Sequence, residues 1–444
     1  MSLLETMWAA LGEDPGALAL VRSHADAIPL DAALPVGALV HDGIAAASLS
    51  ASLLHARRTH GAAGRVELDS DHVATAVTSE RHFRWRGEPM NAWAELSGFW
   101  PAKGGWVRTH ANYPHHRERL LRALGLPEAT TGDDLLRALG TRSAQEIDDV
   151  VTAAGGIATV VRRPEEWREH PHAAAVDAQP LVSVTRIGDA PPTEPHEQFR
   201  VLDLTRVIAG PVATRTLALW GADVLRVDPP TMPELEWQHL DTGAGKRTVV
   251  LDAHDPAFGA LLDRSEVLVT GYRTNGVRSL GLDPHAVAAR RPGIVVARLT
   301  AWGSTGPFAD RRGFDSIVQA ATGISWIESA DGSRPGALPA QALDHTAGYL
   351  LAAGITSALR RRADEGGSWL VEVSLARVAH ALMDAPRARR AKHAAFTPTV
   401  VEYPDLVIPA PAAGFDGSAT AWPSAPVPWG SSAPAWLPRA PRPE

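Results

Sequence analysis

The 444-residue chain contains one sequence pattern twice. Asp42 and Asp344 each open an apolar, Ala/Ser/Leu-rich helical stretch that ends in a cluster of arginines. A glycine-containing turn follows each stretch, and then come VELDSDHVATA from Val66 and VEVSLARVAHA from Val371. Because an ordered series of helix, basic end, turn and matched segment rarely arises by chance, the sequence predicts a partial internal duplication.

Composition and charge exclude several classes of protein. The net charge of −7 and the pI near 6.2 argue against nucleic acid or an anionic membrane as the main partner. The chain has no cysteine, so it has no disulfide, thiolate nucleophile or sulfur-ligated metal. Its N-terminal stretch is acidic rather than basic, and no apolar run is long enough to span a membrane. We therefore expect a cytoplasmic protein without a signal peptide.

From Phe199 onward, β-branched apolar segments alternate with helical segments. FRVLDLTRVIAGP is a β-branched run, ATRTLALWG is helical, and ADVLRVDPP is a second strand that ends in two prolines. This β-α-β unit is followed by further buried strands in KRTVVLDAHD, LDRSEVLVTGY and GIVVARLTAWG. Strands that alternate with helices predict an α/β fold with a doubly wound parallel sheet.

The remaining segments predict three parts. Residues 1–190 contain the first aspartate helix and a smaller α+β domain, with a hairpin between about 90 and 115 and three short helices over 115–150. A polar, Pro-rich linker over 186–197 precedes the Rossmann-like half, residues 198–385, which includes the second aspartate helix. Residues 386–444 are rich in Pro and Trp and are interpreted as an irregular arm that packs through its tryptophans.

The motifs disfavour several cofactors. The turn after the first α/β strand, TRVIAGP, lacks the GxGxxG spacing that cradles a pyrophosphate, so we expect no NAD. The histidine pairs 115/116 and 170/172 are not at ligand spacing for a helix and are interpreted as surface histidines. We therefore predict no metal site.

Asp344 lies just ahead of an apolar helical stripe that starts at Ala347. At that place it is expected to act as an N-cap, which is worth about 1 kcal/mol. A nucleophilic aspartate could occupy the same place, because a helix N-terminus favours an ionised carboxylate. The residues alone leave both readings open.

A resemblance to a known family is carried by a series of segments. VLDLTRVIAGPVATRTLALWGADVLRVDPP, GKRTVVLDAHD, VLVTGYRTNGVRSLGLDP and LTAWGSTGPFADRRGFDSIVQAATG precede the Asp344 helix, and together they resemble the N-terminal half of a family III CoA-transferase. Residues 36–185 resemble the later half of the family, including GGWVRTH and VRRPEEWREHP, and the tail from about 400 is similar to its closing arm. The chain is thus similar to a rearranged, partly duplicated family member.

The resemblance implies a reaction. An aspartate at the start of this helix attacks an acyl-CoA thioester and forms an acyl-aspartyl anhydride, and the CoA then passes to a second carboxylic acid. Asp344 is the implied nucleophile because it follows the α/β half directly, and Asp42 is the less favoured copy. The implied substrates are acyl-CoA and a small carboxylic acid, with no metal and no NAD, and the implied assembly is a homodimer.

The resemblance also implies a set of CoA contacts. Arg273 and Arg312 are the implied partners of the CoA phosphates. The contact segments comprise Ile208, Ala209, Leu251, Asp252, Ala253, His254, Gly271, Tyr272, Arg273, Arg312, Gly313, Phe314 and Asp315.

Departures from the family pattern leave two alternatives open. Gly245 and Gly271 stand where the family often has Asn, and Ser279 stands where an Arg is common. These changes allow a non-catalytic partner subunit of the same fold. The related α-methylacyl-CoA racemases use a histidine where this chain has Phe314, although His345 lies next to Asp344, as His41 does to Asp42.

Overall fold

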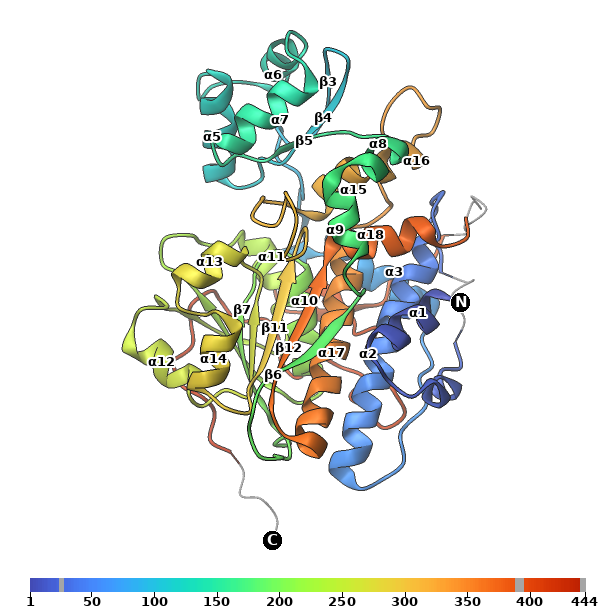
Figure 1. The fold of residues 1–444 in the computed structure, drawn as a ribbon, viewed down its shortest axis with the longest axis vertical. Coiled ribbons are helices and arrows are strands. Elements are labelled where there is room, and N and C mark those ends of the chain that lie inside the picture. Colours follow the sequence, from blue (N-terminus) through green and yellow to red (C-terminus); the bar gives the residue numbers. More distant parts are fainter. Residues whose placement is uncertain (24–27, 388–394, 440–444) are drawn as a thin grey trace.

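The computed structural model describes residues 1–23, 28–387 and 395–439, and a seven-stranded sheet lies at its centre (Figure 1). Six strands run parallel in the order β12-β11-β10-β7-β8-β9, and β6 pairs antiparallel with β12 at one edge. The strands are β6 (Ser183–Gly188), β7 (Arg200–Leu204), β8 (Asp223–Asp228), β9 (Arg247–Val250), β10 (Val267–Thr270), β11 (Val295–Thr300) and β12 (Ser368–Ser374). The predicted doubly wound sheet is confirmed, and its strand order reverses between β7 and β10.

Helices cover both faces of this sheet because successive side chains of each strand point to opposite sides. Val201 and Val269 pack into the core on one face, together with α10 and α17. Leu202 and Leu268 pack into a second core with α12, α13 and α14. The helices are α10 (Ala209–Leu219), α11 (Glu236–Asp241), α12 (Pro256–Leu262), α13 (Thr274–Ser279), α14 (Pro284–Arg290) and α17 (Ala342–Glu365).

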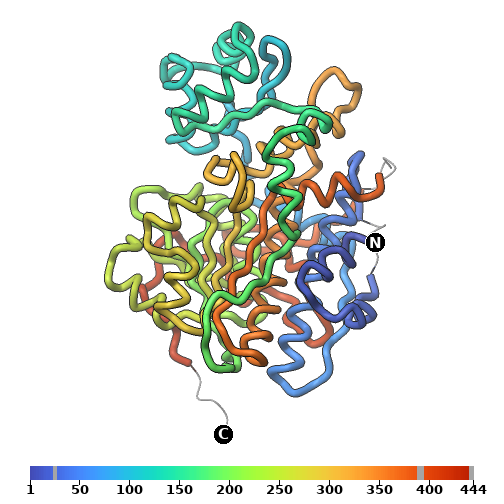
Figure 2. The backbone as a smooth tube through the Cα atoms, viewed as in Figure 1, coloured from blue at the N-terminus to red at the C-terminus, as the bar shows by residue number. Residues whose placement is uncertain are grey.

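The two similar helices of the sequence, α2 (Val36–Thr59) and α17, lie side by side in the fold (Figure 2). Ser50 Oγ donates to the carbonyl oxygen of Ala353 at 2.9 Å, and further along both helices Arg57 contacts Asp364. Because these contacts advance in the same order on both helices, the pair is parallel. The segments that follow also correspond, since α3 (Ser70–Val77) comes after α2 and β12 with α18 (Leu375–Asp384) comes after α17.

The two aspartates occupy different positions in their helices. Both helices have 24 residues, and the residues before them, Pro35 and Gln341, share the torsions φ −77° and ψ 60°. Asp344 is the third residue of α17, whereas Asp42 is the seventh residue of α2. The expectation that Asp42 opens its helix is therefore wrong, because α2 begins directly after Pro35. Asp344, by contrast, lies in the first turn of its helix, but Gln341 is the N-cap.

Helix α2 is long and apolar enough to cross a membrane by length and composition alone. Of its most apolar window, however, 83% is buried inside the fold. Its contacts with α17 and with α1 (Leu3–Ala10) account for this apolar surface.

A smaller α+β domain lies at the top of Figure 1 and has its own apolar core. The predicted hairpin is β3 and β4, and the three predicted helices are α5, α6 and α7. Thr131 and Ser143 cap α6 and α7 with their side chains. The elements are β3 (Gly98–Ala102), β4 (Gly105–Thr109), α5 (Pro114–Leu124), α6 (Gly132–Leu139), α7 (Ala144–Ala153) and β5 (Ala158–Val160).

The structure divides residues 1–190 between two bodies. The segment up to His82 packs with α17 and the arm, whereas residues 98–160 form the smaller domain. Part of the predicted linker is also a strand, because Arg186, Ile187 and Gly188 belong to β6 and pair with the edge of β12. The irregular Pro-rich segment follows only after that strand.

The C-terminal arm begins with two strands that complete a four-stranded sheet in the order β13-β14-β1-β2. Beyond them the arm is irregular, and Trp422 Nε1 donates to the carbonyl of Pro409 at 2.8 Å, as Trp436 Nε1 does to Leu261 at 3.0 Å. Residues 388–394 and 440–444 of the predicted arm lie outside the described residues. The remaining elements are η1 (Pro15–Leu20), α4 (Ser79–His82), β1 (Arg84–Trp85), β2 (Glu88–Pro89), α8 (Pro164–Glu169), α9 (Pro171–Asp177), α15 (Asp315–Thr322), α16 (Ile324–Ile327), β13 (Val400–Tyr403) and β14 (Leu406–Pro409).

Candidate active site

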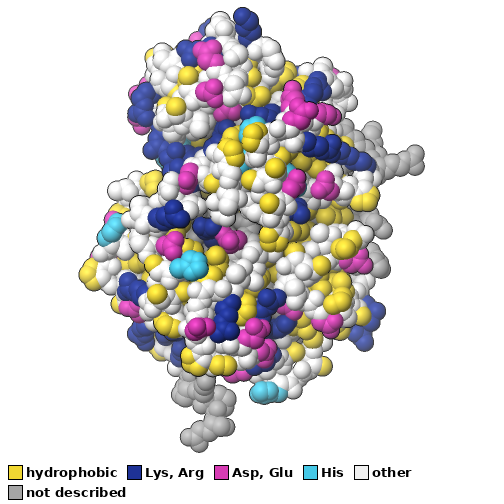
Figure 3. Space-filling model, viewed as in Figure 1, with side chains coloured by type: hydrophobic (Ala, Val, Ile, Leu, Met, Phe, Trp, Pro, Cys, Tyr) yellow, Lys and Arg dark blue, Asp and Glu magenta, His cyan; other side chains and the backbone are white. Residues whose placement is uncertain are grey.

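A cavity of about 290 Å³ lies between the carboxyl ends of β7, β10 and β11 and helix α5 of the smaller domain. Parallel α/β sheets bind ligands at this edge, where the strand order reverses. Figure 3 shows Lys and Arg side chains gathered at the waist between the smaller domain and the body that holds the sheet. The ionisable residues that line the cavity are Tyr113, His115, His116, Arg119, Arg206, Tyr272, Arg273, Arg311, Arg312 and Asp344.

Asp344 supplies the only carboxylate among the described residues that line this cavity. The residue is 7% exposed, and its carboxylate has no hydrogen bond or ion pair with another described residue. Burial, and then the charge of Asp315, hold the pKa of Asp344 well above its usual range. Burial and the Asp315 charge thus act against the ionised carboxylate that the helix start was expected to favour.

Asp315 holds the start of α17 through hydrogen bonds. Its Oδ2 accepts the backbone N–H groups of Leu343 at 2.9 Å and Asp344 at 3.0 Å. Its Oδ1 accepts the side-chain amide of Gln319, whose own oxygen accepts the N–H of Leu338 at 2.9 Å. Burial raises the pKa of Asp315 to about 6 in spite of these hydrogen bonds. Asp315 thus holds the first turn that presents Asp344 to the cavity.

Arginines make the wall of the cavity cationic. Arg312 has no carboxylate within ion-pair distance among the described residues, and burial, followed by Arg273 and Arg119, lowers the pKa of Arg312 to about 10. Arg273 donates to the backbone oxygen of Asp310 at 2.9 Å, which leaves its charge without a paired carboxylate among the described residues. Such an excess of positive charge favours an anionic ligand.

Helix α5 contributes side chains that sequence reasoning did not place at the site. His116 is 7% exposed and its ring contacts Phe314 edge-on at 5.8 Å, so its interpretation as a surface histidine is wrong. Burial, and then His115, lower the pKa of His116 to about 2. His172 is also buried, with 0% exposure. The spacing of His116 with Leu120 and Leu124, on the apolar side of α5, is the signal that could have located it.

The structure brings most of the sequence-predicted contact residues together. Those that line the cavity with Asp344 are Ala209, Gly271, Tyr272, Arg273, Arg312, Gly313 and Phe314. Ile208 is the N-cap of α10 and packs against the core at the start of that helix.

The segment after β9 lies elsewhere. Leu251, Asp252, Ala253 and His254 follow the edge strand of the sheet and are absent from the cavity lining. His254 and Asp252 are exposed and contact each other at 2.8 Å, and Ala253 and His254 line a hollow beside α12 and α14. The position of β9, two strands away from the reversal point, explains this separation.

Asp42 has a different environment from Asp344. Its Oδ2 accepts the N–H of Leu4 at 2.9 Å, and its Oδ1 lies 2.8 Å from His41 Nδ1. The other ring nitrogen of His41 lies 2.9 Å from Ser23 Oγ. Asp42 is thus joined to the start of α1 and is not among the lining residues of the cavity.

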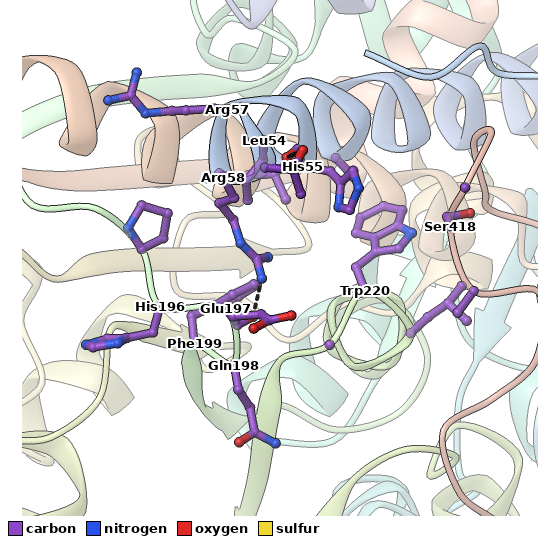
Figure 4. Close-up of a pocket in the computed structure, with 18 of the residues that line it drawn as sticks. Leu54, His55, Arg57, Arg58, His196, Glu197, Gln198, Phe199, Trp220 and Ser418 are labelled. Atoms are coloured by element: carbon purple, nitrogen blue, oxygen red, sulfur yellow. Dashed lines mark hydrogen bonds between the residues drawn. The ribbon is translucent and has the colours of Figure 1, made fainter. Parts of the chain in front are cut away.

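A larger cavity, of about 960 Å³, lies at the other end of the α2–α17 pair (Figure 4). The last turns of α2, segment 194–199 and arm residues 415–419 surround it. Arg58 points across it and donates to the backbone oxygen of Glu197 at 2.6 Å, while the ring of His55 lies 5.6 Å from that of Phe415. Neither Asp42 nor Asp344 lines this second cavity.

Comparison with known proteins bears on the α/β half. Residues 197–399 match the family model described as CoA-transferase family III. The match starts just before β7, ends after α18, and includes Asp344 together with the strand ends around the smaller cavity. Over this segment the chain is similar to the family III CoA-transferases.

Individual proteins are also similar to this chain. The chain is 32% identical to the probable fatty acyl-CoA transferase Rv3272 of Mycobacterium tuberculosis over 205 residues, covering 42% of this chain and 52% of that protein. It is 28% identical to a succinate–glutarate CoA-transferase of Agrobacterium fabrum, covering 43% of this chain and 53% of that protein. A crystal structure of Rv3272 superposes with a TM-score of 0.40 at 31% identity, over 43% of this chain and 57% of the other. The chain thus spans about half the length of the curated relatives it matches.

Proposed function

We propose that this chain is a CoA-transferase that moves CoA between an acyl-CoA thioester and a small carboxylic acid, with Asp344 as nucleophile. The observation that supports this most strongly is the Asp344 carboxylate, which belongs to the segment that matches the family model and faces an arginine-lined cavity. We further propose that the protein acts in the cytoplasm and as a homodimer.

The proposed reaction begins with attack of an Asp344 carboxylate oxygen on the thioester carbonyl carbon. The carbon–sulfur bond breaks, CoA leaves as a thiolate, and a mixed anhydride joins the acyl group to Asp344. The thiolate then attacks the aspartyl carbonyl, which releases the first acid and leaves CoA on Asp344 as a thioester. A second carboxylate attacks the carbonyl carbon of this thioester, which expels the CoA thiolate and forms a second mixed anhydride. The thiolate then attacks the new acyl carbonyl of that anhydride, which forms the new acyl-CoA and frees the Asp344 carboxylate.

The surroundings of Asp344 suit these steps in two ways. The arginines Arg273 and Arg312 offer charge to the phosphates of CoA. The burial of Asp344 limits the access of water, which would hydrolyse the anhydride. Because the attacking form is the carboxylate and the pKa of Asp344 is raised, transfer should become faster as pH rises.

Two aspartate variants test the proposal. CoA transfer from an acyl-CoA to a panel of small carboxylic acids should be abolished in Asp344→Ala and largely retained in Asp42→Ala. Circular dichroism should show that both variants are folded. Full transfer by Asp344→Ala would overturn the proposal, and loss in Asp42→Ala alone would reverse the assignment of the two copies. A folded wild-type protein that binds no CoA ester would favour a non-catalytic partner subunit.

The racemase alternative has one observation in its favour, because His116 lines the same cavity as Asp344 and contacts Phe314. Racemisation requires a base that removes the α-proton and an acid that returns it. With a pKa of about 2, His116 is a weak base, and His110 is stacked on Phe314 at 3.9 Å and has its pKa lowered to about 3. We expect no solvent deuterium at the α-carbon of a 2-methylacyl-CoA, and rapid incorporation would favour the racemase.

A further inference from the structure

The turn between β7 and α10 contains a strained residue that lines the cavity. Val207 has φ +72°, in the left-handed region that β-branched residues rarely adopt. Such a conformation is unfavourable and persists only where surrounding contacts hold it. Strained residues of this kind are concentrated at functional sites.

The Glu234 carboxylate holds this turn. Its Oε2 accepts the backbone N–H of Val207 at 3.0 Å, and its Oε1 accepts the backbone N–H of Leu235 at 3.0 Å. Arg206 and Arg226 contact the same carboxylate at 3.5 and 3.2 Å. With its side chain 1% exposed, Glu234 is fixed from several directions at once.

Glu234 also connects the two walls of the cavity. The hydroxyl of Tyr113, which leads into α5 of the smaller domain, donates to Glu234 Oε1. Arg226 is held in turn by Asp228, at 2.7 and 2.9 Å, so the carboxylate is anchored to strand β8. Tyr113, Arg206 and Val207 all line the cavity, and one buried carboxylate contacts all three.

The conformation of Val207 determines how the next helix begins. Helix α10 starts at Ala209, which lines the cavity, and the first N–H groups of a helix have no partner within it. The turn therefore sets the direction of these N–H groups relative to an anion in the cavity.

We propose that Glu234 is a positioning residue for the transfer reaction, which holds the Val207 turn and Arg206 in place for the CoA thioester. The inference rests on the proposed function. Glu234 does not line the cavity, so it acts through the residues that it holds.

The inference predicts a specific rescue. Glu234→Ala removes the acceptor of the Val207 N–H, so the turn should relax and kcat/KM for acyl-CoA should fall by about 10- to 100-fold. Glycine adopts a positive φ without the steric cost that valine incurs. In the Glu234→Ala background, Val207→Gly should therefore restore at least part of the loss, measured against the single variant Val207→Gly.

The experiment measures kcat and KM for acyl-CoA, and calorimetric CoA binding, in the wild type, both single variants and the double variant. Glu234→Gln provides an isosteric variant in case Glu234→Ala does not fold. Asp263→Asn removes an exposed carboxylate paired with Arg290 at 2.6 Å and serves as the control that should leave both readouts unchanged.

The outcomes distinguish the positioning role of Glu234 from the proposed CoA-transferase function. Rescue by Val207→Gly supports the positioning role, because a merely structural defect at Glu234 would not be repaired at Val207. Wild-type activity in both Glu234 variants, or a loss that Val207→Gly does not change, overturns the inference and leaves the proposed function standing. A wild-type chain that neither binds nor transfers CoA overturns both.

Discussion

Replacing Asp315 by Asn should change both the stability and the pH profile of the protein. Asp315 is fully buried, and its pKa is about 6 against a usual value of 3.8. This difference corresponds to about 3 kcal/mol of unfolding free energy. Since the folded-state pKa is raised, the ionised carboxyl destabilises the folded protein, and this cost grows as pH rises from below 4 to above 6.

Urea unfolding of the wild type and Asp315→Asn at several pH values measures this effect, because titrating groups other than Asp344 largely cancel in the difference. The lower pKa of Asp344 in the variant adds a gain in stability of the same sign. Relative to the wild type, the variant should gain stability as pH rises, and about half of the 3 kcal/mol should appear between pH 5 and pH 8. The variant can also lose a constant amount of stability through weaker hydrogen bonds to Leu343 and Asp344.

The same substitution removes a negative charge that raises the pKa of Asp344. If ionised Asp344 is the nucleophile, the rise of kcat/KM with pH should shift to lower pH in Asp315→Asn. A stability difference that does not change with pH, together with an unshifted rate profile, would refute the reasoning about this carboxylate pair.

Two further substitutions test the cavity and the packing beneath it. Arg312→Gln should raise the KM for acyl-CoA by about 10- to 100-fold, which is the loss expected for one charge-assisted hydrogen bond. The substitution should not lower the melting temperature. An unchanged KM would show that Arg312 is not part of the binding site. Gly348→Ala should lower the unfolding free energy by about 1–3 kcal/mol in urea titrations, because the added Cβ would lie 2.4 Å from the Ala209 oxygen. Gly98→Ala, whose Cβ would meet no atom closer than 3.8 Å, is the matched control, and an equal effect in both would contradict the packing argument.

The order of strands and helices in the α/β half followed directly from the sequence. Runs such as VLDL and VLVT are buried on both faces of a parallel sheet, and their composition alone identifies them. The residues that follow β7 and β10 were expected at the site from the family resemblance, and the structure brings them together because the carboxyl ends of parallel strands meet at one edge. The loop after β9 has the same local pattern, and only the strand order shows that it lies away from the cavity.

Other features depend on contacts between distant segments. Tyr113 and Arg119 reach the cavity from a domain that precedes the α/β half in the sequence, so local patterns could not place them there. The raised pKa of Asp344 arises from burial and from Asp315, which tertiary packing brings behind the helix start. Pro35 marks the true start of α2, but matching the two sequence copies by their aspartates concealed this shift.

The most direct test of the account is to identify the residue that carries the acyl group or CoA during turnover. The protein should be incubated with an acyl-CoA, treated with hydroxylamine, digested, and analysed by mass spectrometry for the aspartyl hydroxamate. The account predicts the modification on Asp344 in the wild type and in Asp42→Ala, and its absence in Asp344→Asn. Modification of Asp42 with Asp344 untouched, or turnover of CoA esters without any modified aspartate, would contradict it.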